Sequence, residues 1–241
     1  MVAVAALLAL SMPVQASKMD NRIESSAKNS YIFKTYLQAD DIKVQSEDGA
    51  VTLTGTVSEE SHKSLAQETV ADLPGVKSVD NMLEVKGTPP AAMSDAWITA
   101  KVKTVFLFHR NVSAITEINT KDGVVTLQGK ASSQAQKDLT TEYAKDVEGV
   151  KGVNNEMTLG KIAEKKRTVG QKIDDASITA QVKMTLLYHR STSALNTSVK
   201  TKHGVVTLSG KAKSGAEMDL AAKFANDVNG VKSVNNRMTI E

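Results

Sequence analysis

The chain has 241 residues, of which 41% are hydrophobic, 24% are charged and only 4% are aromatic; this composition is typical of soluble folded proteins and excludes disordered and fibrous classes. The sequence contains no cysteine, which excludes disulfides, a thiolate nucleophile and a cysteine-ligated zinc site. The net charge is +3 at pH 7 with histidine neutral, and the scarcity of aromatic residues favours several small cores over one large core.

The first sixteen residues differ in composition from the rest of the chain. Residues 2–10 form an uninterrupted apolar run, Pro13 breaks it, and residues 14–16 offer a small-residue cleavage site before Ser17. The run is shorter than the ~20 residues that a membrane-spanning helix needs. We therefore predict a signal peptide over residues 1–16, whose charged n-region is missing from this sequence, and no transmembrane helix in the mature chain. The alternative is that residues 1–16 form a buried apolar arm at the N-terminus. An exported protein without cysteine would fit the bacterial periplasm.

An internal repeat divides the remaining chain into three copies. Residues 48–55 recur as 122–129 and 203–210, and residues 75–81 recur at the same offsets as 149–155 and 230–236. We define module 1 as residues 17–87, with a divergent first helix, module 2 as residues 93–160 and module 3 as residues 173–241, with a basic linker at 161–172. The repeated positions are Gly49, Gly123 and Gly204; Gly55, Gly129 and Gly210; Gly75, Gly149 and Gly230; and Asn81, Asn155 and Asn236.

The patterns within each module predict one order of elements. Module 2 opens with an amphipathic helix, because its apolar residues follow helical spacing from Ile98 to His109, and Ser94 or Asp95 is placed to cap its start. Runs at 115–120 and 124–129 flank a turn dipeptide and predict a β-hairpin. A second helix then ends at Gly149, and alternating residues predict a last strand. Each module is therefore α-β-β-α-β, of the α/β (α+β) class, with two helices packed on a three-stranded sheet.

Three local patterns carry a resemblance to a known family. Asp-x-x-Ile-Thr opens the first helix at 95–99 and 175–179, a Gly-Val-Val-Thr-Leu-x-Gly strand lies at 123–129 and 204–210, and Gly-Val-x-x-Val-x-Asn recurs in all copies. With these patterns, residues 20–241 resemble the BON domain and the osmotically inducible periplasmic protein Y group. In module 1, residues 21–24 replace the usual helix opening. The resemblance implies envelope location, association with osmotic stress, binding to phospholipid or to unfolded outer-membrane clients, and no catalysis.

One glycine pair superficially resembles a phosphate-binding loop. Five residues separate Gly123 from Gly129, where a Walker A motif has four, and Ala131 stands where serine or threonine must hold magnesium. The glycine that ends this strand instead predicts a bulge or a close backbone approach. We find no catalytic constellation and no cofactor motif, and we expect a protein that is not an enzyme and has no cofactor.

The histidines and the repeated asparagines have structural explanations. His109 and His189 recur at one helix position, without the spacing of a metal site. We expect no metal, and we expect His109 to be partly buried and hydrogen-bonded to the adjacent hairpin. The asparagines are in phase with inward strand residues, and because a buried amide needs partners, we expect them to tie down a turn.

Charge is distributed unevenly along the chain. Residues 17–86 carry 8 basic and 12 acidic residues, residues 87–160 carry 8 of each, the linker carries 5 and 1, and residues 173–241 carry 9 and 6. The cations between modules 2 and 3 would attract anionic head groups or phosphates, although an ordinary solvated linker has a similar composition. The signal peptide argues against a nucleic-acid partner. The candidate contacts in the linker are Lys165, Lys166 and Arg167.

The first helix of module 2 is the strongest candidate for a binding surface. Trp97, Lys101 and Phe108 lie on one stripe beside the core face, and Tyr188 is the module 3 counterpart of Phe108. Aromatic rings beside an ammonium group suit a membrane interface, so we expect binding to anionic phospholipid at the cell envelope. The alternative function is a periplasmic chaperone-like holdase for unfolded outer-membrane or secreted proteins. The remaining alternative is that the apolar residues Trp97, Leu107 and Leu187 of these helices pack against a neighbouring module.

Overall fold

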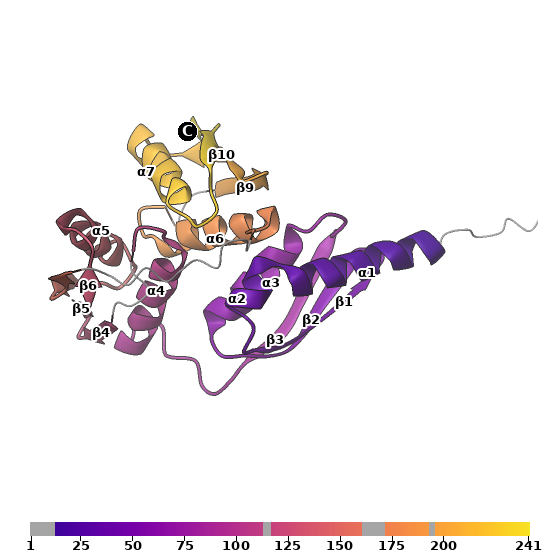
Figure 1. The fold of residues 1–241 in the computed structure, drawn as a ribbon, viewed down its shortest axis with the longest axis horizontal. Coiled ribbons are helices and arrows are strands. Elements are labelled where there is room, and N and C mark those ends of the chain that lie inside the picture. The colour runs from indigo at the N-terminus through magenta and orange to yellow at the C-terminus, as the bar shows by residue number, and fades with distance from the viewer. Residues whose placement is uncertain (1–12, 113–116, 161–171, 193–195) are drawn as a thin grey trace, which may run out of the picture.

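The computed structural model describes residues 13–112, 117–160, 172–192 and 196–241. The predicted signal peptide lies outside these ranges except for its last four residues, which begin the first helix. Three units with the order α-β-β-α-β follow one another along the chain (Figure 1), which confirms the predicted fold class.

Module 1 contains one continuous sheet. Its central strand pairs antiparallel with the preceding strand and parallel with the last one, because a helical crossover separates them. The helices lie on one face of this sheet (Figure 1). The elements are α1 (Pro13–Asn29), α2 (Tyr31–Thr35), β1 (Asp41–Glu47), β2 (Ala50–Val57), α3 (Glu60–Ala71) and β3 (Ser78–Val85).

Modules 2 and 3 repeat this topology, but their last strand is interrupted after four residues. The elements of module 2 are α4 (Asp95–Phe108), β4 (Glu117–Lys121), β5 (Val124–Gln128), β6 (Lys130–Ala131), α5 (Gln134–Lys145), β7 (Gly152–Asn155) and β8 (Thr158–Leu159). Those of module 3 are α6 (Asp175–Tyr188), β9 (Asn196–Lys202), β10 (Val205–Ala212), α7 (Gly215–Asn226), β11 (Ser233–Asn236) and β12 (Thr239–Ile240).

An aspartate of the first helix accepts hydrogen bonds from the hairpin turn in every module, at the helix start in modules 2 and 3 and within α1 in module 1. In α4 the helix cap is Ser94, whose hydroxyl accepts a hydrogen bond from the Trp97 amide, and this leaves Asp95 free to act elsewhere. The Asp95 carboxylate accepts hydrogen bonds of 2.8 Å from the amides of Asp122 and Gly123 in the turn. Asp175 and Asp20 make the corresponding bonds in modules 3 and 1.

Module 1 therefore keeps this aspartate, although α1 begins at Pro13 and residues 21–24 differ from the other copies. Asp20 and Ile23 reproduce the Asp-x-x-Ile spacing of the other copies, and Ile23 is 1% exposed in the core. Hydrogen bonds from the Ser46 hydroxyl and the turn amides lower the pKa of Asp20, because they favour its ionised form.

The repeated glycines and asparagines stabilise the turns and the strand ends of each module. All nine repeated glycines have positive φ angles. At Gly210, φ is +130°, and a Cβ atom would lie 2.0 Å from the carbonyl oxygen of Asn196, so the two backbones approach too closely for any side chain. The Asn236 amide donates to the Met218 carbonyl of α7, and its side-chain oxygen accepts from the Met238 amide, which ties the last strand to the second helix.

Candidate binding surface

Modules 2 and 3 form a reciprocal pair. The segment after α4 bonds to the end of α7, where the Arg110 amide donates to the Asp227 carbonyl, and the segment after α6 bonds to the end of α5, where the Arg190 amide donates to the Asp146 carbonyl. Two short antiparallel bridges, His109 with Val228 and Val147 with His189, repeat the same exchange. Because equivalent positions meet in both directions, the two modules are related by an approximate two-fold axis, as in an isologous dimer.

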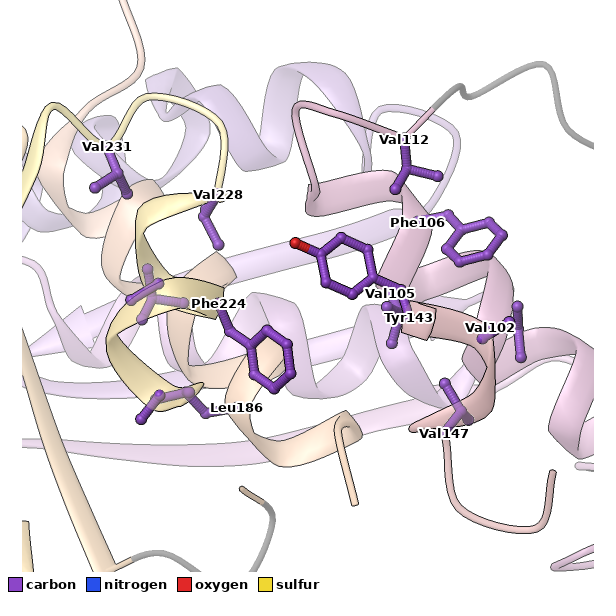
Figure 2. Packing of buried hydrophobic residues seen from close by; sticks show 14 of the residues in the cluster. Val102, Val105, Phe106, Val112, Tyr143, Val147, Leu186, Phe224, Val228 and Val231 are labelled. Atoms are coloured by element: carbon purple, nitrogen blue, oxygen red, sulfur yellow. The ribbon is translucent and has the colours of Figure 1, made fainter. Parts of the chain in front are cut away.

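The two cores merge across this contact. Figure 2 shows Tyr143 of α5 and Phe224 of α7 side by side between the modules, with ring centroids 5.8 Å apart. Tyr143 stacks on His109 and Phe224 stacks on His189, each with ring centroids 4.0 Å apart. The buried apolar residues of modules 2 and 3 consequently form one cluster instead of two.

The two histidines meet on the axis. Their Nε2 atoms lie 3.0 Å apart, and the side chains of His109 and His189 are 2% and 0% exposed. Nδ1 of His189 lies 3.1 Å from the Asp146 carboxylate, so it carries a proton, and the neutral ring then accepts from Nε2 of His109. In this assignment Nδ1 of His109 is a bare acceptor, consistent with its lack of a partner among the described residues.

The expectation that His109 bonds its own hairpin is therefore wrong, because docking of module 3 supplies its partner. Burial, and to a smaller extent the nearby His189, lower the pKa of His109 to about 3.

Module 1 covers the outer face of α6. The side chains of Ala176, Ala180 and Met184 are buried in the core of module 1. Lys183 lies 3.0 Å from Glu68 of α3 and 2.9 Å from Asp72, which caps the end of α3. In Figure 1, α6 lies between module 1 and the rest of module 3. This position explains why α6 is buried around most of its circumference.

The start of α6 is covered by α2. The Tyr31 amide donates to the Asp174 carboxylate at 2.8 Å, and the Ile32 amide donates to the Ser177 hydroxyl at 3.2 Å. Tyr36, just after α2, packs edge-on against Phe108 of α4 with ring centroids 5.7 Å apart. Module 1 thereby seals the stripe formed by Ser177, Gln181 and Phe108.

The equivalent stripe of α4 is only partly covered, and we refer to it as the open stripe. By the approximate symmetry, Trp97 corresponds to Ser177, Lys101 to Gln181, and Tyr188 to Phe108. The Lys101 ammonium lies 3.9 Å from the centre of the Trp97 ring and 5.1 Å from that of Tyr188, and all three side chains are only partly buried. Burial lowers the pKa of Lys101, and the Glu148 carboxylate 3.7 Å away opposes this effect.

The structure thus groups Trp97, Lys101 and Tyr188, but it separates Phe108 from them. Phe108 is 1% exposed, so in this arrangement its ring is closed to a bilayer. The alternative explanation for Leu107 and Leu187 was that they pack against a neighbouring module. In the structure their side chains remain 38% and 53% exposed. The linker residues Lys165, Lys166 and Arg167 lie outside the described residues.

The described residues contain no group of three or more His, Asp or Glu side chains placed to hold a metal ion. No helix in the described part of the chain is both long and apolar enough to cross a membrane.

The repeat, the order of elements and the hairpin-fastening aspartate define one domain type present three times. The family model for the BON domain matches residues 19–87, 94–161 and 174–241. The chain belongs to the BON domain family. These matches cover all three modules, including module 1 with its diverged helix opening.

Two relatives support the assignment. The chain is 38% identical to osmotically-inducible protein Y of Escherichia coli over 145 residues, which cover 60% of this chain and 71% of the relative. It is 29% identical to the outer membrane lipoprotein DolP of Haemophilus influenzae over 149 residues, which cover 61% and 75%. A solved structure of CdsD from Chlamydia trachomatis covers 92% of this chain at 15% identity, but its TM-score of 0.25 is too low to carry an argument.

Proposed function

We propose that this BON protein is a non-catalytic component of the bacterial cell envelope that binds anionic phospholipid through the open stripe of α4. The observation that carries this proposal is the contrast between two equivalent surfaces. Module 1 covers the stripe on α6, whereas the stripe on α4 presents Trp97 and Lys101 beside Tyr188, the last residue of α6.

The chemistry of the open stripe suits a bilayer interface. An indole and a phenol have apolar rings with a polar end, and such side chains settle at the depth of the lipid head groups. The ammonium of Lys101 lies between the two rings, where it can meet a lipid phosphate while its alkyl chain stays against the aromatic faces. The exposed side chain of Leu107 adds apolar area about three helical turns beyond Trp97.

The relatives support an envelope location. One is named as osmotically inducible and another as an outer membrane lipoprotein, and the predicted signal peptide over residues 1–16 is consistent with export. We therefore propose that the protein acts in the periplasm, in association with osmotic stress.

The fluorescence of Trp97 tests the proposal directly, since it is the only tryptophan in the chain. Titration with vesicles that contain phosphatidylglycerol should shift its emission to shorter wavelength, and vesicles of phosphatidylcholine should do so much less. In co-sedimentation, Trp97→Ala should weaken binding by about tenfold or more, because burying a large apolar side chain contributes about 1.5–3 kcal/mol.

Leu159→Ala is the matched control, because Leu159 is another exposed apolar residue of module 2, at the end of the sheet. This variant should bind as the unchanged protein does. Unchanged emission together with suppression of client aggregation would refute the proposal in favour of a chaperone-like holdase.

A further inference from the structure

The sheet of each module has one face that its own helices leave open. The outward residues of the strands alternate with buried ones, as in β9, where Lys200 and Lys202 are exposed on either side of the inward Thr201. Equivalent positions on the three sheets are matched by strand register: Lys202 pairs with Val205, just as Lys121 pairs with Val124. The three open faces are therefore copies of one surface and can be compared residue by residue.

Their charges run from negative to positive. The outward residues of β1, β2 and β3 include four acidic residues and one basic residue, namely Asp41, Glu47, Asp80, Glu84 and Lys43. Those of module 2 are balanced, with Glu117, Glu156, Lys121 and Lys130. Those of module 3 are basic alone, with Lys200, Lys202, Lys211 and Arg237. Two acidic positions of module 2, Glu117 and Glu156, become Ser198 and Arg237 in module 3.

In the described strands of module 3, no outward position carries an acidic side chain. Within the described residues, Lys202, Lys211 and Arg237 are exposed and form no ion pair. Lys200 is close enough to module 1 for its charge to act on the pKa of Asp72, and Glu241 follows β12 at the edge of the sheet. The side chains between the cations are small and polar, including Thr207, Ser209 and Asn235.

We propose that the open sheet face of module 3 is a second, electrostatic docking surface for an anionic phospholipid bilayer. The inference rests on the proposed function for the identity of the partner, but it concerns a different surface from the stripe of α4. The acidic face of module 1 would be repelled by the same bilayer, so the charge gradient would also orient the molecule, with module 3 towards the lipid.

A bilayer suits this face better than the acidic face of a second copy does. Exposed ion pairs between two proteins contribute little, because two side chains must be held in one geometry and salt screens them. An anionic bilayer presents many mobile head groups, so each lysine finds a phosphate without a fixed partner and the contributions add.

The test compares two double variants at equivalent positions. Lys202→Gln with Lys211→Gln removes two cations from module 3. Lys121→Gln with Lys130→Gln removes the cations at the two equivalent positions of module 2, whose sheet face carries balanced charge. At low salt, co-sedimentation with phosphatidylglycerol vesicles should weaken about fivefold per lysine in module 3, and no more than about twofold in total in module 2. High salt should remove the difference between the variants.

Each outcome decides the proposal. Equal losses in the two double variants, or no loss in module 3, would overturn it. Sedimentation-velocity runs without lipid supply the other arm: self-association that Lys202→Gln with Lys211→Gln abolishes would assign the face to a second copy instead. Trp97 emission separates this surface from the stripe of α4, because the module 3 variant should still show a blue shift at saturating lipid. If the lysines matter but the emission never shifts, only the proposal for α4 fails.

Discussion

Acidification should weaken the contact between modules 2 and 3 through His109. The groups that face this ring are His189 at the end of α6, Tyr143 on α5, and, beyond them, the carboxylates of Asp146 and Asp227. Protonation would place a charge in an apolar site that offers Nδ1 of His109 no partner among the described residues. The folded protein therefore resists the proton, which the unfolded chain accepts readily.

The direction and size of the effect follow from this difference. The pKa of His109 is about 3 in the folded protein, against 6.5 for an unperturbed histidine. Stability is thus fully present above pH 6.5 and declines as the pH falls towards 3. At pH 5, 1.5 units below the unperturbed value, the free energy of unfolding should be lower than at pH 8 by about 2 kcal/mol. The pKa of the nearby Asp146, which burial raises but hydrogen bonds from His189 and Ser191 lower overall, lies below its ordinary value, so this carboxylate stays ionised between pH 5 and pH 8.

Urea unfolding at pH 8 and pH 5, followed by Trp97 fluorescence and circular dichroism, measures this loss. His109→Gln should be less stable at pH 8, because the stacked ring is removed, but its stability should change much less between the two pH values. His203→Asn is the matched control, since His203 is exposed in a hairpin turn with φ of +54°, which asparagine tolerates. If His109→Gln kept the full pH dependence of the unchanged protein, protonation of His109 would not be the cause of the loss of stability.

Two further substitutions test the close backbone approach at Gly210 and the ion pairs between α6 and module 1. Gly210→Val should destabilise the protein by more than about 3 kcal/mol and lower the melting temperature, since its Cβ would meet the Asn196 carbonyl; Gly215→Ala, with open space around the new methyl group, should not. Lys183→Met should lower the free energy of unfolding in urea by about 1 kcal/mol, because it leaves Glu68 and Asp72 half-buried without their cation. Lys103→Met changes the equivalent exposed lysine of α4, and an equal loss there would contradict the role of the ion pair.

The local structure of each module could be predicted from the chain alone. Apolar spacing, turn dipeptides and the recurrence of whole strings determine helices, hairpins and strands, because these depend on residues close in sequence. Asp20 shows how fine this signal is. The Asp-x-x-Ile spacing was present in module 1, one residue before the segment compared with the other copies, and would have identified the hairpin-fastening carboxylate there.

The neighbours of each helix were decided by tertiary structure. The sequences of α4 and α6 do not reveal which helix is more deeply buried, since both carry apolar residues on several sides. The docking of module 1 on α6 decides it: Phe108 is buried, whereas Trp97 remains partly exposed. The meeting of His109 with His189 likewise joins residues 80 positions apart. Sequence periodicity determines which residues share a face, but a face acquires its partner through packing between modules, and that depends on shapes and charges assembled only after each module has folded.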